Sequence, residues 1–360
     1  MKILVINCGS SSIKYGLVDV ERAEIIIGGV IDKIGVDVKS HKVALEIILD
    51  RLVQPPDTVI KEKKELMAVG HRVVHGGEEF KEAVLIDENV IKDIRSYFEL
   101  APLHNPSNLM GIEVAKKLLS GIPQVAVFDT AFHQTMPAYA YLYALPYRFY
   151  KQYGIRRYGF HGTSHKYVSL EASKILRKPL KKLKLVTCHL GNGCSLAAVK
   201  NGKSVDTSMG WTPLEGLVMG SRCGDIDPAI VFYLMDKEGL SVKQISSLLN
   251  KESGLLGLSD ISSDMRDILR MANKDNPRAK IALEVFIYRL RKYIGAYIAV
   301  MNGIDALIFT GGIGENAEII REKIKTEISY LLKGAQILVI PTNEELMIAQ
   351  ETAGIVKERR

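Results

Sequence analysis

A strand–turn–strand pattern occurs twice in this chain, and the repeat restricts the folds that the chain can adopt. In the first copy, residues 2–18, two apolar runs flank a small polar turn at 7–12. In the second copy, residues 184–199, two apolar runs flank the glycine-rich turn HLGNG at 189–193. Because an internal repeat usually reflects a repeated structural unit, the pair predicts a duplicated α/β fold of two domains with a central cleft.

The second turn has the composition of a phosphate-binding loop. Two glycines flank Asn192, and glycine allows positive φ and a close approach of the backbone to a ligand. Backbone N–H groups that turn inward in such a loop can form an anion-binding nest. The same residues also fit an ordinary β-hairpin, and the following Asn201-Gly202 pair favours a two-residue hairpin turn. The repeat favours phosphate loops in both halves.

Composition indicates a small phosphate-bearing ligand rather than nucleic acid. The chain has 360 residues, which is enough for two domains, and a formal net charge of +7. Its 48 Lys and Arg residues are scattered, without a basic arm, a zinc signature or an RNA-binding motif. We therefore expect no nucleic-acid partner.

The sequence predicts neither a signal peptide nor a membrane span. The apolar run after Lys2 is too short for a signal peptide. The most apolar helical stretch, near 293–303, is followed closely by Asp305. The four cysteines lack metal-ligand spacing, and reduced thiols are usual in the cytosol, so we expect a cytoplasmic protein without a membrane partner.

Strands alternate with helices along the chain, which is typical of α/β layers. The pair Pro55-Pro56 predicts a chain break, and the polar stretch at 253–268 predicts a loop. Apolar residues at helical spacing predict helices at 43–52, 89–100 and 282–302.

Two segments that follow predicted strands are candidate ligand contacts, because α/β layers bind ligands at strand ends. GGIGENA at 311–317 has a suitable place for phosphate or nucleoside contact, although it could be an ordinary turn. Arg72 lies in HRVVHGG and is either a surface arginine or a fork directed at a carboxylate. His71 and His75 in the same segment do not predict a metal pair, because they lie where a strand passes into a loop.

Motifs along nearly the whole chain resemble the acetate kinase family in kind and order. They are NCGSSSIKY, HRVVHGG, LHNP, FDTAFHQTMP, YGFHGTSH, HLGNG, DTSMGWTPLEGLVMGSRCGDIDP, SGLLGLS, SSDMRD, GGIGEN and IPTNEEL. The resemblance implies the duplicated ribonuclease H-like fold of the acetate and sugar kinase, Hsp70 and actin superfamily. It implies an N-terminal domain of residues 1–133 plus 345–360 and a C-terminal domain of residues 134–344 with the nucleotide site. The implied activity is reversible, direct in-line phosphoryl transfer from ATP to acetate by a homodimer, with Mg²⁺ as the cofactor and Mn²⁺ as a substitute.

The resemblance also implies roles for residues at matching positions. The implied catalytic residues are Asp129, His161 and Arg222, and the implied metal ligands are Asn7 and Glu344. The implied substrate contacts are Arg72 for the carboxylate and Val74, Leu103, Phe160 and Pro213 for the acyl group. The implied nucleotide contacts are Lys14, His189, Leu190, Gly191, Asn192, Gly193, Asp264, Met265, Arg266, Gly312, Ile313, Gly314, Glu315 and Asn316.

This residue set suits phosphoryl transfer to acetate. Negative charge spreads over the phosphoryl oxygens during transfer, and Arg72, His161 and Arg222 can donate hydrogen bonds to it. Acetate resembles a side-chain carboxyl group with a pKa of about 4, so it is already ionised at pH 7 and needs no general base. We therefore interpret Asp129 as orienting an arginine, Mg²⁺ or its waters rather than accepting a proton.

Three alternative functions stay open. The first is a related acyl kinase for propionate or butyrate, and the second is an actin- or Hsp70-like ATPase switch. The third is a nucleotide-binding module without chemistry. The chain is also shorter than most family members, before residue 66 and between Glu318 and Val339, but neither gap removes a motif.

Overall fold

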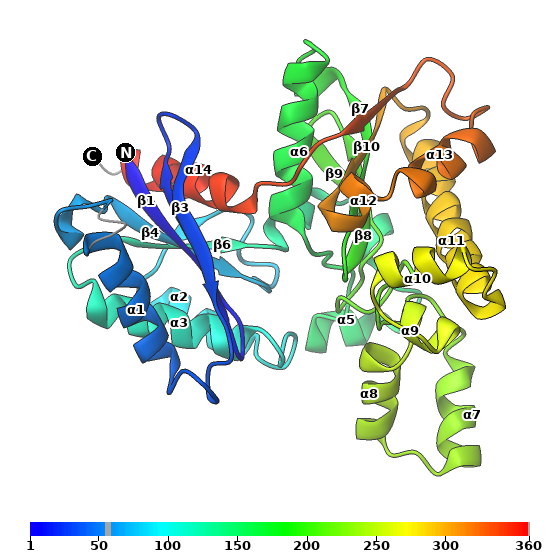
Figure 1. Ribbon diagram of the computed structural model, residues 1–360, viewed down its shortest axis with the longest axis horizontal. Coiled ribbons are helices and arrows are strands. Elements are labelled where there is room, and N and C mark those ends of the chain that lie inside the picture. The colour runs from blue at the N-terminus through cyan, green and yellow to red at the C-terminus, as the bar shows by residue number, and fades with distance from the viewer. Residues whose placement is uncertain (55–58, 359–360) are drawn as a thin grey trace. The chain divides into compact units, whose positions relative to one another are not determined.

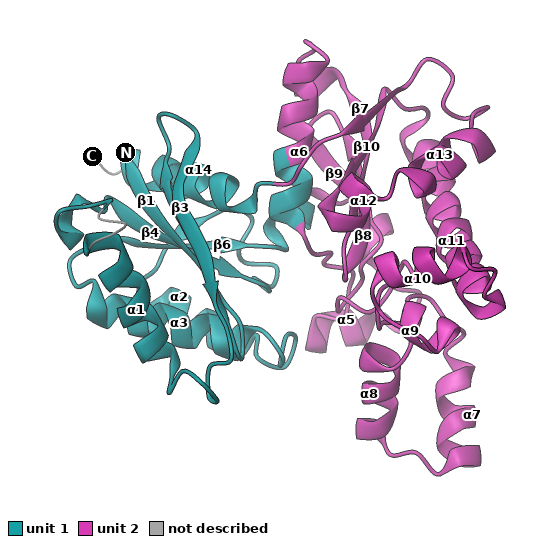
Figure 2. Ribbon diagram, in the orientation of Figure 1, with its two compact units in different colours: residues 1–134, 162–167, 343–360 teal, residues 135–161, 168–342 magenta. Residues whose placement is uncertain are grey.

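The computed structural model describes residues 1–54 and 59–358, so the predicted break at Pro55-Pro56 lies outside the described residues. The chain forms two compact units, shown with their elements in Figure 1 and by colour in Figure 2. Unit 1 comprises Met1–Gln134, Gly162–Tyr167 and Asn343–Arg360. Unit 2 comprises Thr135–His161 and Val168–Thr342.

Unit 1 contains a six-stranded mixed sheet with the order β3-β2-β1-β4-β6-β5. β1 pairs antiparallel with β2 and parallel with β4, which pairs parallel with β6. The strands are β1 (Lys2–Cys8), β2 (Ile13–Asp19), β3 (Glu24–Ile31), β4 (Ala68–Val73), β5 (Val84–Leu85) and β6 (Gln124–Phe128). The helices are α1 (His41–Val53), α2 (Glu88–Ser96), α3 (Asn105–Leu118) and α14 (Glu344–Lys357).

Helices cover both faces of the unit 1 sheet, and β1 shows why. Leu4 and Ile6 of β1 lie in a core with side chains of α1 and α3. Ile3 and Val5 lie in a second core, on the α14 side. Successive side chains of a strand point to opposite faces, so an uninterrupted apolar run requires cover on both faces.

Unit 2 contains a five-stranded sheet with the order β11-β10-β7-β8-β9. Its strands are β7 (Lys184–Leu190), β8 (Cys194–Lys200), β9 (Lys203–Thr207), β10 (Ala306–Thr310) and β11 (Gln336–Val339). Its helices are α4 (Ala138–Tyr141), α5 (Tyr147–Tyr153), α7 (Ala229–Glu238), α8 (Val242–Lys251), α9 (Gly254–Ser259), α10 (Met265–Ala272), α11 (Pro277–Met301), α12 (Gly311–Asn316) and α13 (Glu318–Glu327). α6 (Gly162–Ile175) begins in unit 1 and continues in unit 2.

The two sheets repeat one topology, which confirms the predicted duplication. In each, a three-stranded antiparallel meander is followed by two parallel strands, so β1, β2, β3, β4 and β6 correspond to β7, β8, β9, β10 and β11. The register shift is repeated as well, between Leu17 and Val18 in β2 and between Ala198 and Val199 in β8. Both shifts follow the fifth residue of a seven-residue strand. A β-bulge kept at equivalent places is a feature of the repeated unit rather than an accident of one copy.

Three local structures differ from the simplest expectation. GGIGEN at 311–316 forms the short helix α12 rather than an ordinary turn, and 253–268, predicted as a loop, contains α9 and the start of α10. The turn of the second hairpin is shorter than predicted, because His189 is in β7. Gly311 explains the first difference: its φ is 76°, and a Cβ there would lie 2.8 Å from the carbonyl oxygen of Leu190. Glycine thus permits a helix start packed directly on β7.

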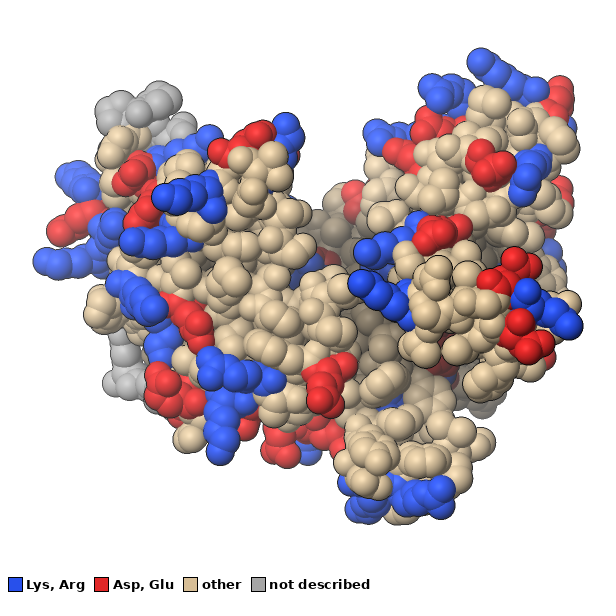
Figure 3. Space-filling model, turned by 90° about the horizontal axis from the view of Figure 1, so that it is seen from below, with Lys and Arg blue, Asp and Glu red and all other residues tan. Residues whose placement is uncertain are grey.

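Basic and acidic side chains are interspersed on the molecular face drawn in Figure 3. None of the helices in the described part of the chain combines the length and apolar character that a membrane crossing requires.

Candidate active site

Arg72 and Asp129 come together because they lie at the carboxyl ends of adjacent parallel strands. Arg72 is near the end of β4 and Asp129 directly follows β6, with Val73 of β4 in register with Phe128 of β6. Nε of Arg72 is 3.0 Å from Oδ1 of Asp129, and Nη2 is 2.7 Å from Oδ2. This two-point contact uses Nε and Nη2, and Nη1 lies 4.0 Å from Oε2 of Glu344.

Burial and mutual charge act together on this pair. Asp129 is 2% exposed, and burial raises the pKa of its carboxyl group above the ordinary value, against the opposing effect of Arg72. Burial alone would lower the pKa of the Arg72 guanidinium, but the charges of Asp129 and Glu344 outweigh it and raise that pKa. Arg72 therefore remains a cation, and Asp129 is bound to it as an acceptor.

The proposed metal ligands lie in the same unit as this pair. Glu344 is the first residue of α14, and Asn7 of β1 is in register with Lys14 of β2. Lys14 forms an ion pair with Glu345, so its ammonium group is engaged within unit 1. Among residues 1–54 and 59–358, no group of three or more His, Cys, Asp or Glu side chains is placed to hold a metal. Mg²⁺ usually takes one or two protein oxygens together with waters and phosphates, and an amide and a carboxylate fit that donor set.

In unit 2, His161, His189 and Arg222 surround the turn that joins β7 and β8. A Cβ on Gly193 would lie 3.5 Å from Nη1 of Arg222 and 3.5 Å from Cε1 of His161. The rings of His161 and His189 stack with centroids 4.2 Å apart, and Nδ1 of His161 is 2.8 Å from Oγ of Ser195. The absence of a side chain at Gly193 therefore lets two potential donors approach the turn.

His161 is held in an uncommon backbone conformation. Its φ is 57° and its ψ is 24°, in the left-handed region, at the N-cap of α6. Such conformations cost free energy for a residue with a side chain and are frequent at functional sites. Gly162, the next residue, donates its N–H to the carbonyl oxygen of Asp129 at 2.9 Å, and a Cβ on Gly162 would lie 2.2 Å from that oxygen.

Arg222 is a guanidinium that no acidic residue neutralises within the described parts of the chain. Nη1 donates to the carbonyl oxygen of Pro213 at 3.1 Å and lies 3.7 Å from Sδ of Met219. Burial lowers the pKa of Arg222, with a smaller opposing effect from Cys194. A half-buried cation without a carboxylate partner among the described residues is a candidate contact for an external anion.

A pocket of about 800 Å³ in unit 2 brings three of the predicted nucleotide segments together. Sites for small molecules typically have volumes of roughly 300–1,000 Å³. The lining residues are Gly191, Asn192, Ser263, Asp264, Met265, Arg266, Leu269, Gly312, Ile313, Asn316 and Ala317. Ser263 and Leu269 were not anticipated, whereas Ala317 is the last residue of the candidate segment GGIGENA. Leu269 follows Met265 by one helical turn, a spacing that the prediction of a loop at 253–268 concealed.

Several predicted nucleotide contacts lie outside this lining, and Glu315 shows a reason. Its Oε1 accepts hydrogen bonds from the backbone N–H of Gly311 at 2.8 Å and of Thr342 at 3.2 Å, so its carboxylate is used to hold α12. The other residues outside the lining are Lys14, His189, Leu190, Gly193 and Gly314.

Asp264 orients a lining residue. It accepts from the backbone N–H of Arg266 at 2.8 Å and pairs with the guanidinium of the same residue. The Arg266 contact lowers the pKa of Asp264 to about 2.

The residues predicted to surround the acyl group differ in exposure. Val74 is 8% exposed in unit 1, whereas Leu103 of the same unit is 63% exposed. In unit 2, Phe160 is 2% exposed and Pro213 is half-buried. The backbone N–H of Val74 donates to Oδ1 of Asn108 at 3.1 Å, which holds this end of β4.

Comparison with known proteins assigns the family. The model of the acetokinase family matches residues 2–332. The acetate kinase of Halothermothrix orenii is 54% identical over 397 aligned positions, which cover 99% of this chain and 100% of that protein. The alignment is longer than the 360 residues of this chain, so the relative contains segments that this chain lacks.

Solved structures agree with this assignment. The crystal structure of Porphyromonas gingivalis acetate kinase has a TM-score of 0.94 at 44% identity and covers 99% of both chains. A propionate kinase from Francisella tularensis has a TM-score of 0.91, also at 44% identity, and covers 97% of this chain and 98% of that one. These likenesses confirm the predicted fold class. The chain belongs to the acetokinase family.

Proposed function

We propose that this protein transfers the γ-phosphoryl group of ATP to acetate, reversibly, giving ADP and acetyl phosphate. The observation that carries the proposal is Arg222, a half-buried guanidinium beside the Gly193 turn that no described acidic residue neutralises. The full-length similarity to an acetate kinase supports acetate as the acceptor. The two-point contact of Arg72 with Asp129 supports a carboxylate site in unit 1.

The proposed reaction needs no proton acceptor. An oxygen of the acetate carboxylate attacks the γ-phosphorus in line, and the bond from that phosphorus to the bridging oxygen of ADP breaks. The electron pair of that bond leaves with ADP. Because acetate is ionised at pH 7, catalysis consists of positioning the reactants and stabilising charge on the transferring group.

Each residue then has a role that matches its surroundings. Arg72 binds the acetate carboxylate through the side that Asp129 leaves open, and Asp129 fixes the direction of the guanidinium. Arg222 and His161 donate hydrogen bonds to the phosphoryl oxygens, where charge develops. The pocket lined by Asn192 and Gly312 holds the nucleotide. In the acyl site, Val74, Leu103, Phe160 and Pro213 are the proposed contacts of the methyl group.

We also propose Mg²⁺ as the cofactor, with Mn²⁺ as a substitute, bound through Asn7 and Glu344. When bound, the ion neutralises charge on the nucleotide phosphates. Asn7 provides an amide oxygen and Glu344 provides a carboxylate, both in unit 1. The Glu344 carboxylate lies 4.0 Å from Nη1 of Arg72. The proposal includes a cytoplasmic location, which suits the four free cysteines.

The test measures acetyl hydroxamate formed from ATP, acetate and hydroxylamine, with propionate and butyrate in parallel. We expect acetate to have the highest kcat/KM and Arg222→Ala to reduce kcat far more than it changes the KM for ATP. Arg222→Lys is the matched control, because it retains the charge without the planar fork. Full turnover by Arg222→Ala, or acetate-independent ATP hydrolysis as the main reaction, would contradict the proposal.

Propionate is the second candidate acceptor, because the Francisella tularensis propionate kinase has a TM-score of 0.91. The same substrate panel decides between the two acids. A higher kcat/KM for propionate than for acetate would replace the first proposal with the second.

A homodimer is part of the proposal, and unit 2 has apolar surface to support it. All of α7 is described, and none of its residues is buried, although its sequence is largely apolar. Phe232 is 71% exposed and Tyr233 is 62% exposed. Apolar surface of this kind on a globular protein commonly marks an interface, and twofold homo-oligomers are the commonest assemblies.

Light scattering on a size-exclusion column tests the assembly. We expect the mass of two chains for the wild type and of one chain for a Phe232→Asp, Tyr233→Asp double variant. Lys237→Ala, on the same helix, is the control for surface changes. A wild-type protein that runs as one chain at micromolar concentration would contradict the homodimer.

A further inference from the structure

The polypeptide that carries Arg222 has neither helix nor strand between the end of β9 at Thr207 and the start of α7 at Ala229. The same segment contains Pro213, whose carbonyl oxygen accepts the 3.1 Å hydrogen bond from Nη1 of Arg222. Because no described carboxylate pairs with Arg222, the direction of its guanidinium depends on where the backbone places Pro213. The position of Pro213 therefore depends on contacts that hold the backbone of this segment.

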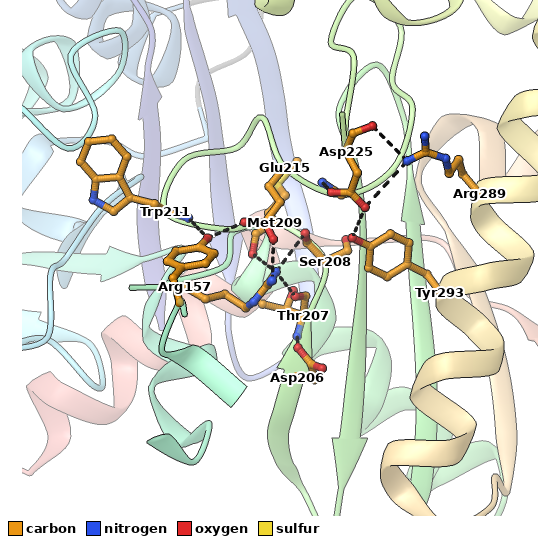
Figure 4. Close-up of polar contacts among 12 residues, drawn as sticks. Arg157, Asp206, Thr207, Ser208, Met209, Trp211, Glu215, Asp225, Arg289 and Tyr293 are labelled. Carbon is orange, nitrogen blue, oxygen red and sulfur yellow. Dashed lines mark hydrogen bonds and ion pairs between the residues drawn. The ribbon is translucent and has the colours of Figure 1, made fainter. Parts of the chain in front are cut away.

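A first anchor holds this segment at Glu215, two residues after Pro213 (Figure 4). Nη2 of Arg157 donates to Oε1 of Glu215 at 2.5 Å, and the hydroxyl group of Tyr143 donates to Oε2. Nη1 of Arg157 also donates to backbone carbonyl oxygens at 2.8, 3.2 and 3.3 Å, which belong to Thr207, Ser208 and Met209. Arg157 therefore ties Glu215 to the end of β9.

A second anchor lies at Asp225, three residues after Arg222. Oδ1 of Asp225 accepts from the backbone N–H of Gly216 at 2.8 Å, and Oδ2 accepts from the hydroxyl group of Tyr293 at 2.7 Å. Nη1 of Arg289 donates to the carbonyl oxygen of Asp225 at 3.1 Å. Tyr293 and Arg289 belong to α11, so Asp225 ties Gly216 and the part of the segment after Arg222 to a long helix.

Glycines in this segment show how closely the anchors pack. A Cβ on Gly210 would lie 1.7 Å from Oε2 of Glu215 and 2.3 Å from the hydroxyl oxygen of Tyr143. Gly216 has a φ of 110°, and a Cβ there would lie 2.5 Å from the carbonyl oxygen of Ser208. The backbone is therefore held in one arrangement that side chains at these positions would disrupt.

We propose that Glu215 and Asp225 are positioning residues that hold the Pro213 carbonyl and, through it, direct Arg222 to the Gly193 turn. Both carboxylates have cationic neighbours, Arg157 for Glu215 and Arg289 for Asp225, so neither draws Arg222 away. The inference rests on the proposed function, because it serves the phosphoryl contact assigned to Arg222.

The test is a double-mutant cycle in the acetyl hydroxamate assay, using Asp225→Ala and Glu215→Ala alone and combined with Arg222→Ala. Displacing a catalytic group by about 1 Å can reduce turnover by about 100-fold, so each single variant should lose about 10- to 100-fold in kcat. The KM for ATP should be unchanged, because neither carboxylate lines the nucleotide pocket. In the Arg222→Ala background, both substitutions should change kcat by less than about twofold, because the group that they position is gone.

Two further variants keep the test decisive if an alanine variant fails to fold. Asp225→Asn retains an oxygen for the N–H of Gly216 and should recover most of the activity. Tyr293→Phe removes one hydroxyl group and should lower kcat in the wild type but not in the Arg222→Ala background. Glu322→Ala, an exposed carboxylate on α13 that pairs with Lys325, is the control and should behave as the wild type.

Equal losses of kcat in the presence and absence of Arg222 would overturn the positioning roles, as would a higher KM for ATP with normal kcat. Failure of the proposed function is a separate result: the wild type would then form no acetyl hydroxamate. Normal turnover by Arg222→Ala would overturn both the phosphoryl contact assigned to Arg222 and the positioning roles assigned to Glu215 and Asp225.

Discussion

The guanidinium of Arg72 and the carboxylate of Asp129 meet at two points, with Nε 3.0 Å from Oδ1 and Nη2 2.7 Å from Oδ2. The Asp129 side chain is 3% exposed and that of Arg72 is 19% exposed. Removing one member of a buried ion pair leaves an uncompensated charge. The pair therefore links the stability of unit 1 to the proposed acetate site.

Asp129→Ala should lower the free energy of unfolding by about 3 kcal/mol, at the low end of the usual range because Arg72 is partly exposed. Arg72→Leu combined with Asp129→Leu should recover much of that loss, because no unpaired charge is then buried. Urea denaturation measures the stability, and the acetate KM should rise in the double variant. Equal stability of Asp129→Ala and the wild type would show that the contact contributes little.

Gly312 allows the proposed nucleotide pocket to be blocked without disturbing the fold. It lines the pocket, and a Cβ added there would meet no atom within 4 Å. Gly312→Leu should therefore raise the KM for ATP by at least about tenfold, because a bulky side chain would occupy the ligand volume. The melting temperature should stay near that of the wild type. Gly354→Leu is the matched control, since Gly354 is also helical, has equally open space and lies outside the pocket.

Val74 should influence the choice between acetate and propionate. One methylene group in an apolar pocket is worth about 1–3 kcal/mol, so Val74→Ala should narrow or invert the acetate-to-propionate ratio of kcat/KM. If Val74 instead serves the core, where it is 8% exposed, stability should fall by roughly 1–3 kcal/mol with an unchanged ratio. Kinetics with both acids at one temperature distinguish these outcomes.

His71 should make stability depend on pH in a mildly acidic window. It is 2% exposed, and burial lowers its pKa from 6.5 to about 4, although Nε2 is 2.7 Å from Oε1 of Gln124. Between these pH values the unfolded chain binds a proton that the folded chain excludes. The free energy of unfolding should therefore have its full value above pH 6.5 and fall by on the order of 3 kcal/mol as the pH decreases to about 4.

The variant His71→Gln isolates this effect, because glutamine can donate to Gln124 but does not titrate. Denaturation of both proteins from pH 4 to pH 7 should show a steeper slope for the wild type. If stability fell equally with pH in both proteins, His71 would not cause the fall. The acidic side chains, which both proteins share, would then account for it.

Local patterns in the sequence determined the two hairpins and the long helix of unit 2. Alternating apolar runs around small polar turns predicted β1–β2 and β7–β8, because side-chain direction in a strand has a period of two residues. Apolar periodicity predicted a helix at 282–302, and α11 begins earlier, at Pro277. Asn276 and Pro277 mark that start: Oδ1 of Asn276 accepts from the N–H of Ala279 at 3.0 Å. Such signals act within a few residues, so they are readable without the fold.

The resemblance to a family located the candidate residues, but only the tertiary structure shows what each contacts. Arg72 and Asp129 are 57 residues apart, and their contact requires β4 and β6 to be neighbours. Glu315 was expected at the nucleotide, yet its carboxylate binds two backbone N–H groups of the fold, one of them 27 residues away.

The position of the segment that carries Arg222 depends even more on residues far away in the sequence. Its segment is held by Tyr143 and Arg157 before it and by Tyr293 after it, and Tyr293 is 68 residues beyond Asp225. Contacts over such separations depend on strand order and helix packing, which local propensity does not encode. Sequence alone therefore determined the repeated strand–turn–strand unit, whereas tertiary packing decided which charges are paired and which, like that of Arg222, have no acidic partner among the described residues.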